Sequence, residues 1–357
     1  MLDFRSSLYL GLHHPSRSLA PWDRLTTGVP AALGEPPAAW LVAAALARLQ
    51  GCERAIVARS TLHAFLDCFA VLGGRDRPVL VDTGAYPIAG WAAGAALARP
   101  VVRFGHHDPD DLRRRLRRLR RPLVVCDGLC PGCGAVAPLA GYLELTDRHG
   151  GLLLIDDTQA LGVLGRRDRP GPYGTGGGGS PAWAGVGGPR VLVVASLAKG
   201  LGAPLAAIAG GAGPLGRLAD GRPARVHASP PSTADLHAAW HALDANRRVG
   251  EARRERLRAL VARLRRRLVE RGVAICGGPF PVQSLPAMPP PAAARIAAAL
   301  DAHGMRAVLQ RPRCRDGATV TLLVNADHTA GEIDRVVDAL AGALGATRRR
   351  EGARRAG

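Results

Sequence analysis

The chain has 357 residues, 47 % of them hydrophobic, which is enough for one large α/β domain or two domains. The chain has 48 lysine and arginine residues and 29 acidic residues, which give a formal net charge of +19. Aromatic residues, on which bases would stack, make up only 4 %, and no nucleic-acid-binding motif is present. These two features argue against a nucleic acid partner in spite of the positive charge. The chain has no run of about 18 uncharged apolar residues and no basic-then-apolar signal at its start, so we expect no membrane span and a cytoplasmic protein.

Apolar strands alternate with helical patterns through the first 200 residues. This alternation, with strands that are apolar almost throughout, predicts an α/β fold with a mostly parallel sheet covered on both faces. Residues 165–188 are rich in glycine, proline and arginine and are expected to form a long surface loop. The predicted strands are residues 55–58, 78–81, 100–104, 123–126, 151–155 and 191–195, and the predicted helices are 60–72, 88–98, 109–121 and 138–149.

The pattern changes after Pro231. A long helix is predicted over residues 234–271, followed by a smaller α/β unit with strands at 273–276, 307–310 and 319–324 and helices at 291–303 and 329–344. We therefore predict a large domain over residues 1–235 and a long helix with a small C-terminal α/β domain over 236–344. Residues 345–357 are expected to form a disordered basic tail.

Arginine is concentrated in residues 113–121, 253–267 and 348–355. Three explanations remain open: a coding bias toward arginine, solvated helix faces, or a surface for an acidic partner such as coenzyme A or an acyl carrier protein.

Seven cysteines are present, an odd number in a long chain, which argues against a secreted disulfide framework. Cys126, Cys130 and Cys133 have the spacing C-x3-C-x2-C, which also occurs in enzymes that carry an iron–sulfur cluster. Because Cys126 ends an apolar strand, we interpret these residues as packing cysteines and expect no metal site.

Lys199 is the only lysine of the chain; every other member of the 48 lysine and arginine residues is arginine. A neutral lysine amine can attack a carbonyl to form a Schiff base, whereas a guanidinium cannot. The residue follows the apolar strand 191–195 and precedes the turn Gly200–Pro204, a place suited to a carbonyl cofactor. The alternative is chance survival of one lysine under a drift toward arginine.

Asp156 ends another predicted strand, where ligands bind in doubly wound sheets. Pyridoxal phosphate needs such a carboxylate to keep its pyridine nitrogen protonated. An aspartate at the end of a strand is often only a helix cap or an ion-pair partner. The combination of this aspartate with the single lysine, which follows a later strand, is a more specific indication of a pyridoxal phosphate site. Helix-start N–H groups and hydroxyls bind phosphate, and the candidates are Ser60, Thr61, Leu62, Ser196 and Ser229.

Five segments, in order along almost the whole chain, resemble the motifs of one enzyme family. They are residues 2–12, Asp127-Gly128 with Ala137-Pro138-Leu139, the stretch 156–165 that begins Asp-Asp-Thr-Gln, the stretch 196–202 around Lys199, and His227–Pro231. On these segments the chain is similar to the α-oxoamine synthase group of fold-type I pyridoxal phosphate enzymes, the group of 8-amino-7-oxononanoate synthase. The resemblance implies the fold-type I architecture, a large sheet domain with a smaller C-terminal domain.

The resemblance also implies roles for individual residues. Lys199 would form the Schiff base with pyridoxal phosphate and later move protons, and Asp156 would pair with the pyridinium nitrogen. Tyr86 falls where the family places a histidine that stacks on the ring, and an aromatic side chain can stack equally well. Ser229 matches a residue that reaches the phosphate from a second subunit, which implies a homodimer with shared sites.

The chain departs from the family pattern at several positions. Gln159 replaces the histidine that contacts the ring oxygen of the cofactor, and an amide donates a hydrogen bond but takes up no proton near neutral pH. Ser7 replaces the opening asparagine. The late strand 319–322 lacks the family arginine that holds the substrate carboxylate, and Arg311 and Arg313 are the nearby candidates to replace it.

Three functions follow from these observations. The first is an acyltransferase that joins an amino acid to an acyl thioester, on coenzyme A or acyl carrier protein, with loss of carbon dioxide to give an α-aminoketone. The second is an aminotransferase- or aldolase-type reaction without a thioester, which the departures at Gln159 and the late strand favour. The third is a non-catalytic relative, against which the retained Asp156 and Lys199 argue.

Overall fold

A computed structural model describes residues 1–14, 17, 23–73, 77–97 and 100–356, with side chains described up to residue 346. The chain divides into two compact units. The larger unit comprises residues 12–130 and 136–251, and the smaller unit comprises residues 1–11, 131–135 and 252–357. None of the helices in the described part of the chain combines the length and the apolar character that a membrane crossing requires.

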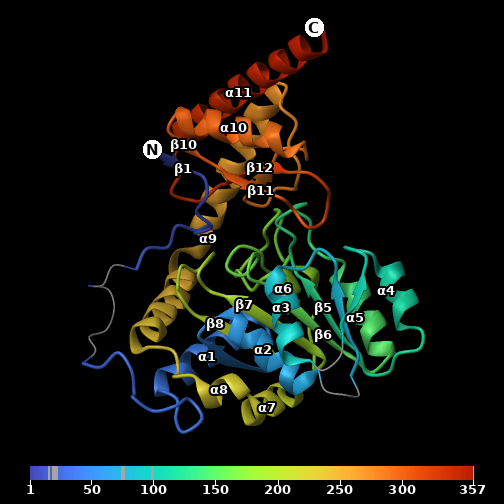
Figure 1. Ribbon diagram of the computed structural model, residues 1–357. Helices are drawn as coiled ribbons and strands as arrows, with labels where there is room; N and C mark the ends of the chain where they lie inside the picture. The colour runs from blue at the N-terminus through green and yellow to red at the C-terminus, as the bar shows by residue number, and fades with distance from the viewer. Residues whose placement is uncertain (15–16, 18–22, 74–76, 98–99, 357) are drawn as a thin grey trace. The chain divides into compact units, whose positions relative to one another are not determined.

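The larger unit contains a seven-stranded sheet with the strand order β2-β8-β7-β6-β5-β3-β4 (Figure 1). Neighbouring strands from β7 to β4 are parallel, and β8 alone runs antiparallel to both of its neighbours. The carboxyl ends of β5, β6 and β7 therefore meet at one edge of the sheet. The strands are β2 (Arg54–Ala58), β3 (Val79–Asp82), β4 (Val102–Phe104), β5 (Leu123–Asp127), β6 (Leu152–Asp156), β7 (Val191–Ser196) and β8 (Ala206–Gly210).

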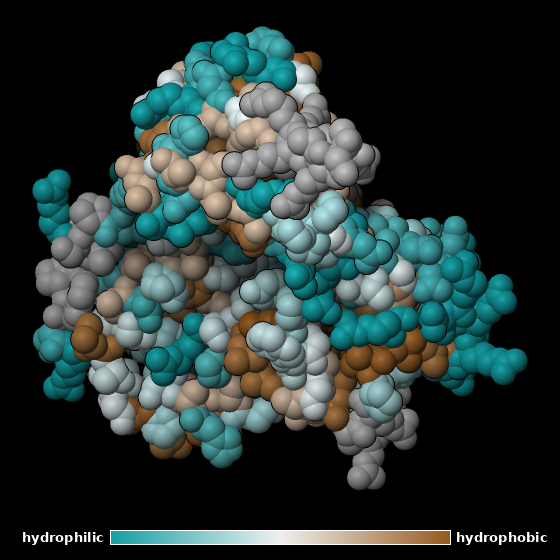
Figure 2. Space-filling view, turned by 45° about the horizontal axis from the view of Figure 1, so that its top comes forward, coloured by the Kyte–Doolittle hydropathy of each residue, from teal (hydrophilic) through white to brown (hydrophobic). Residues whose placement is uncertain are grey.

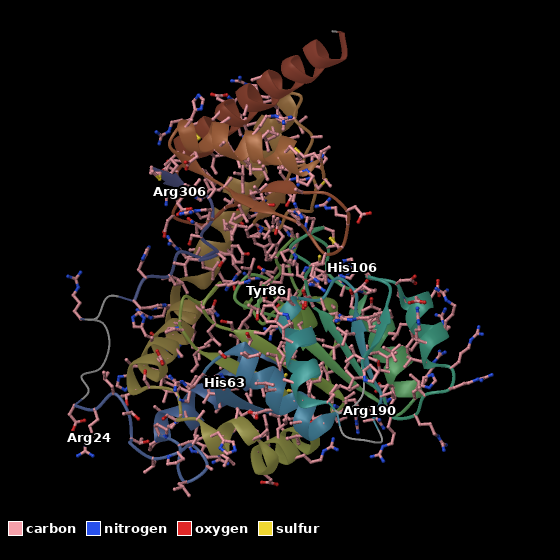
Figure 3. All side chains as sticks on the ribbon, viewed as in Figure 1. Arg24, His63, Tyr86, His106, Arg190 and Arg306 are labelled. Carbon is pink, nitrogen blue, oxygen red and sulfur yellow. The ribbon has the colours of Figure 1, made fainter. Side chains whose placement is uncertain are left out.

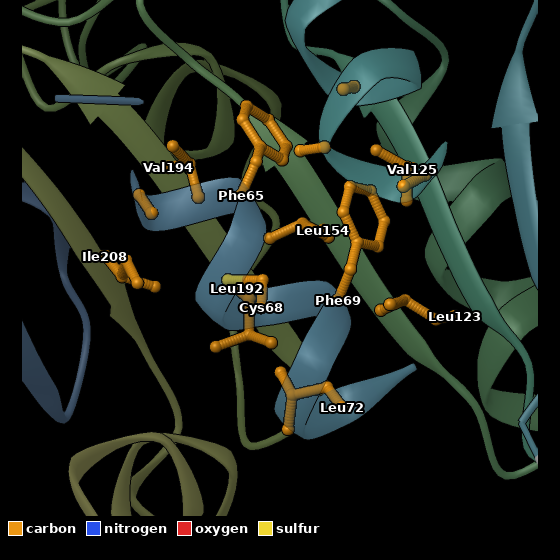
Figure 4. Packing of buried hydrophobic residues seen from close by; sticks show 14 of the residues in the cluster. Phe65, Cys68, Phe69, Leu72, Leu123, Val125, Leu154, Leu192, Val194 and Ile208 are labelled. Carbon is orange, nitrogen blue, oxygen red and sulfur yellow. The ribbon is translucent and has the colours of Figure 1, made fainter. Parts of the chain in front are cut away.

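Helices cover both faces of this sheet because each strand has apolar side chains on both sides. Val79 and Val81 face one cluster of buried residues with helices α2, α3 and α7, as Figure 4 shows for part of that cluster. Leu80, between them in sequence, packs in a second cluster with helices α4 and α5. The helices that begin in this unit are α1 (Pro37–Gln50), α2 (Thr61–Leu72), α3 (Pro87–Ala96), α4 (Pro109–Leu116), α5 (Leu139–Arg148), α6 (Ser180–Ala184), α7 (Ala212–Gly221), α8 (Pro223–His227) and α9 (Thr233–Glu270).

The smaller unit holds a three-stranded antiparallel sheet with the order β11-β12-β9 and a two-stranded parallel pair, β1 with β10. Helices α10 and α11 belong to the same unit. Its elements are β1 (Leu2–Asp3), β9 (Val282–Ser284), α10 (Pro290–Ala302), β10 (Met305–Arg306), β11 (Val308–Gln310), β12 (Thr319–Leu323) and α11 (Ala330–Ala356).

Most predicted elements occur within a few residues of their expected bounds, but the division of the chain differs. The units separate within α9, between residues 251 and 252, and the first eleven residues belong to the smaller unit through the pairing of β1 with β10. The expected division after residue 235, with the N-terminus in the large domain, therefore does not match the compact units. Helix α11 continues to Ala356 and so includes most of the segment that we expected to be disordered.

Three local expectations also need correction. Helix α4 ends at Leu116 rather than at residue 121. No strand forms over 273–276, where the backbone makes only an isolated bridge between Cys276 and Ser284. The segment 165–188 is only partly a surface loop, because it contains α6 and its residues 177–181 are buried.

Candidate cofactor site

Asp156 and the turn that carries Lys199 lie at the carboxyl ends of two adjacent strands. Asp156 is the last residue of β6 and pairs with Val194 of β7. The chain leaves β7 at Ser196 and turns through Lys199 before it returns as β8, with the Leu197 N–H donating to the Leu205 carbonyl at 2.8 Å. Parallel β6 and β7 therefore place a carboxylate and an amine at the same edge of the sheet, as the sequence predicts.

Thr158 ties these two strand ends together. Its N–H donates to Asp156 Oδ1 at 3.0 Å, and its Oγ1 accepts a hydrogen bond from the Ser196 N–H at 3.0 Å. The lysine turn is also packed against the segment after β6, since a Cβ on Gly200 would lie 2.3 Å from the Leu161 carbonyl oxygen. The relative positions of the carboxylate and the lysine turn are therefore set by the hydrogen bonds of Thr158 and by close backbone packing at Gly200.

Burial controls the protonation of both groups. Burial raises the pKa of Asp156, while the hydrogen bonds from Thr158 and the charge of Lys199 act in the opposite direction. Burial lowers the pKa of Lys199, and the charges of Asp156 and Asp127 oppose that shift. A lysine with a lowered pKa supplies more of the neutral amine that attacks a carbonyl.

Asp127 is a further acidic residue beside Asp156; from the sequence we noted it only as part of a family motif and assigned it no role. It is the last residue of β5, directly opposite Asp156 in the register of the two strands. Both of its carboxylate oxygens lie 3.1 Å from the backbone nitrogen of Tyr86. Burial, and then the charge of Asp156, raise the pKa of Asp127 well above its usual range. Its signal in the sequence was the same as that of Asp156, an acidic residue at the end of an apolar strand.

Three of the residues predicted to bind phosphate lie at the amino end of α2. Ser60 is the N-cap, and its Oγ accepts a hydrogen bond from the His63 N–H at 3.4 Å. Thr61 and Leu62 are the first two residues of the helix, where backbone N–H groups have no intrahelical partner. These N–H groups, together with the partial positive charge of the helix end, form an anion-binding arrangement.

Three other predicted residues lie on loops or at a strand end of the same unit. Tyr86, labelled in Figure 3, immediately precedes α3, and its side chain is 56 % exposed. Gln159 is partly buried, three residues after Asp156. Ser196 ends β7 and accepts a hydrogen bond from the Ala198 N–H at 3.2 Å, which places its hydroxyl inside the lysine turn.

Ser229 follows α8 and is exposed. It lines a small cavity whose other lining residues include His63, Asp67 and Arg222. Arg222 is buried and bridges to Glu35 at 2.9 Å, so an ion pair supports the wall of this cavity.

The predicted substrate residues Ser7, Arg311 and Arg313 belong to the smaller unit. Arg311 and Arg313 are exposed in the segment that follows β11, and Ser7 lies between β1 and the turn at Tyr9. The strand β12, where the family arginine is missing, instead uses its threonines internally, since Thr321 Oγ1 lies 2.8 Å from Ser284 Oγ. Ser7, Arg311 and Arg313 remain predictions.

The donor set in the larger unit fits pyridoxal phosphate. An amine with a lowered pKa matches an aldehyde, buried strand-end carboxylates match a pyridine nitrogen, and a helix amino end with a serine N-cap matches a phosphate. The aromatic side chain of Tyr86 and the amide of Gln159 are of the types that stack on a ring and donate to a ring oxygen.

Known proteins resemble this chain over most of its length. Residues 38–340 match the family "Aminotransferase class I and II". The 8-amino-7-oxononanoate synthase of Halorhodospira halophila is 32 % identical over 348 residues, which cover 94 % of this chain and 84 % of that protein. A putative 8-amino-7-oxononanoate synthase of Desulforudis audaxviator is 32 % identical over 357 residues, covering 96 % and 88 %.

Solved structures share the fold at lower identity. The serine palmitoyltransferase of Sphingomonas wittichii has a TM-score of 0.85 at 20 % identity and covers 97 % of this chain and 87 % of its own. The 8-amino-7-oxononanoate synthase of Francisella tularensis has a TM-score of 0.77 at 16 % identity and covers 96 % and 98 %. The architecture is therefore that of a fold-type I pyridoxal phosphate transferase, as predicted. The chain belongs to the aminotransferase class I and II family, as a pyridoxal phosphate-dependent transferase of the α-oxoamine synthase type.

Proposed function

We propose that this enzyme condenses an amino acid with an acyl thioester and releases carbon dioxide, giving an α-aminoketone. The observation that carries the proposal is the set of Lys199, Asp156 and Asp127 at the ends of β7, β6 and β5, in a chain that is 32 % identical to an 8-amino-7-oxononanoate synthase over nearly its whole length.

The proposed reaction is balanced without an oxidant or reductant. The α-carbon of the amino acid loses its carboxylate as carbon dioxide and forms a bond to the acyl carbon, whose bond to sulfur breaks. The products are the α-aminoketone, carbon dioxide and the thiolate of coenzyme A or a carrier protein. Pyridoxal phosphate supplies the electron sink that stabilises a carbanion at the α-carbon.

The residues of the larger unit would divide the work as follows. Lys199 would hold the cofactor, and its Nζ would then take up and return the α-proton, for which a lowered pKa suits it. Asp156 would bind the pyridine N–H, and the start of α2 from Ser60 would bind the phosphate. Gln159 would donate to the ring oxygen, where its amide orients the ring without exchanging a proton.

The acyl donor would be an anionic thioester, with coenzyme A or an acyl carrier protein as its carrier. Arginines 117, 118 and 120 lie just beyond the end of α4 and are exposed, whereas Arg113 and Arg114 in the helix pair with Asp110 and Asp111. In Figure 2, hydrophilic side chains project at the right-hand edge, on the side where Figure 1 places α4. A cationic edge of this kind attracts phosphates or acidic side chains.

A homodimer would complete the site. Trp40 on α1 and Trp91 on α3 are 64 % and 71 % exposed, and aromatic residues are enriched in surfaces that a partner covers. By the family resemblance, Ser229 would reach the phosphate bound in the partner subunit. Mixed dimers test this role: co-expressed Lys199→Ala and Ser229→Ala chains should form one native site per heterodimer and regain wild-type cofactor affinity at that site. Affinity equal to that of the Ser229→Ala homodimer would place Ser229 in its own subunit's site.

The reaction itself is tested with a panel of amino acids, each mixed with acyl-coenzyme A or acyl carrier protein. We expect release of free thiol and carbon dioxide in equal amounts, dependent on Lys199 and absent in Lys199→Ala. Amino-group transfer or aldol cleavage without thiol release would replace the proposal with the second predicted reaction. Failure of the native chain to bind pyridoxal phosphate covalently would favour the non-catalytic alternative.

A further inference from the structure

The loop after β5 brings a cysteine into the smaller unit. An isolated bridge between Leu129 and Val136 closes this loop, and residues 131–135 within it pack in the smaller unit. The carbonyl of Gly132 accepts a hydrogen bond from Arg315, so the loop is held beside the residue that follows Cys314. The sulfur atoms of Cys133 and Cys314 lie within 4.8 Å of each other.

Close packing fixes the loop at a second point. Gly134 has a φ of +71°, and a Cβ there would lie 2.7 Å from the Cα of Gly277, so backbone meets backbone without room for a side chain. Two anchors, one on each side of Cys133, therefore keep its sulfur near that of Cys314.

The sulfurs of Cys133 and Cys314 are close enough to bind one metal ion. Two sulfurs on one tetrahedral zinc ion lie about 3.8 Å apart, given Zn–S bonds of about 2.3 Å. The separation of Cys133 and Cys314 therefore needs only a small adjustment.

Cys126 is excluded from this group. It lies within strand β5, fully buried, and burial raises the pKa of its thiol well above the usual range, so it stays protonated. Of the C-x3-C-x2-C pattern considered from the sequence, only Cys133 belongs to the smaller unit.

We propose that Cys133 and Cys314 bind a thiophilic divalent cation, with zinc the best fit, in a structural site of the smaller unit. Their two thiolates and two further ligands would complete the tetrahedral coordination that zinc prefers. The ion would join residues 131–135 to the segment around Cys314, whereas the sequence led us to interpret Cys133 as a packing cysteine.

The test measures metal in the full-length enzyme, purified without chelators and without metal-affinity resin. We expect elemental mass spectrometry to find about one zinc ion per chain in the wild type. In Cys133→Ser and in Cys314→Ser the zinc content should fall below about a tenth of the wild-type value. Cys276→Ser is the matched control, because Cys276 belongs to the same unit but not to this cluster, and it should keep its zinc.

A second experiment needs no variant and therefore applies even if the serine variants do not fold. Metal is removed from the wild-type protein, which is then reconstituted with Co²⁺. Thiolate-to-cobalt charge-transfer absorption together with the visible bands of tetrahedral cobalt would support the site. Zinc-free protein that also gives no such absorption would overturn the proposal. So would zinc content that does not change in the Cys133 and Cys314 variants, or a disulfide between these residues in protein alkylated during cell lysis.

Discussion

Asp127 and Asp156 are directly opposed in the register of β5 and β6, so two buried carboxyl groups share one strand edge next to the lysine turn. Two carboxyl groups that close cannot both ionise easily, and burial and mutual repulsion raise the pKa of Asp127 well above its usual range. The charge of Asp127 in turn favours the protonated form of Lys199.

Asp127→Asn should therefore lower the pKa of Lys199 further. The amide retains an acceptor for the Tyr86 N–H but removes the negative charge that Asp127 supplies at a pH above its raised pKa, and this charge stabilises the ammonium form. Visible absorption measures the rate at which the cofactor-free enzyme binds pyridoxal phosphate covalently. This rate should rise with pH in both proteins, and the curve of Asp127→Asn should lie at lower pH than the wild-type curve. The exposed Asp220→Asn serves as the control and should leave the curve in place; an unmoved curve for Asp127→Asn would refute the coupling.

The parallel strands and the positions of the candidate site residues at their ends could be predicted from sequence because buried parallel strands have a continuous apolar pattern. Strands 123–126, 151–155 and 191–195 were found on that basis, and Asp156 and Lys199 followed from their positions at strand ends. β8 was missed because Ala206–Gly210 contains alanine, glycine and one isoleucine, and gives no strong β signal. Its antiparallel partners supply the stability that its own composition does not.

Long-range pairing explains the other misses. The first residues join the smaller unit through contacts with residues far away in sequence, such as the pairing of Leu2 with Met305, and no local pattern could show this. The interior of the 165–188 segment was taken for surface because it is rich in glycine, yet Gly179 lies against buried Asp157, where a Cβ would be 1.7 Å from the carboxylate. Glycine there reflects close packing rather than exposure.

Asp157 should give the enzyme a specific pH dependence of stability. It is fully buried, accepts hydrogen bonds from Ser180 N–H at 3.0 Å and Ser180 Oγ at 2.5 Å, and burial raises its pKa to about 7. A folded-state pKa above the unfolded value means that the folded state binds the proton more tightly. The stability that this proton contributes is present at about pH 4 and is lost as pH rises to about 7.

Asp157→Asn removes this titration. The wild type loses stability with rising pH as Asp157 loses its proton, whereas the variant does not. The free energy of unfolding of the variant minus that of wild type should therefore increase by up to about 1.4 kcal/mol per pH unit between about pH 4 and pH 7. Denaturant unfolding at pH 5, 6 and 7 measures the difference. Asp301→Asn, at an exposed aspartate, should show no such trend, and a flat difference for Asp157→Asn would contradict the raised pKa.

Gly200 should tolerate no side chain beside Lys199. A Cβ would lie 2.3 Å from the Leu161 carbonyl oxygen, so the lysine turn must move. Gly200→Ala should cost about 1–3 kcal/mol of unfolding free energy, the range for overpacking, and weaken cofactor binding. Gly216→Ala is the control: Gly216 is in α7 with open space around it, and alanine there should be neutral or stabilising. Equal effects of the two substitutions would rule out a packing role for Gly200.

Ser60 should contribute to phosphate binding beyond its role as a helix cap. Ser60→Ala should lower stability by about 1 kcal/mol through loss of the cap. It should also weaken affinity for pyridoxal phosphate more than affinity for pyridoxal, which lacks the phosphate. Ser232 is a matched cap, since its Oγ accepts a hydrogen bond from Asp235 N–H at 3.0 Å at the start of α9. Ser232→Ala should lower stability equally but leave the ratio of the affinities for pyridoxal phosphate and pyridoxal at the wild-type value. A wild-type ratio in Ser60→Ala as well would argue against phosphate binding at α2.

The arginines after α4 should act on the acyl donor through charge. Replacing Arg117, Arg118 and Arg120 with glutamine removes three exposed cations, and the KM for the acyl thioester should rise several-fold at low ionic strength while kcat stays constant. The difference should shrink at about 0.5 M salt, because screening weakens attraction between exposed charges. Replacing the same three residues with lysine keeps the charge and should keep the wild-type KM. An unchanged KM in the glutamine variant at low salt would show that these arginines are a solvated surface without a role in binding the thioester.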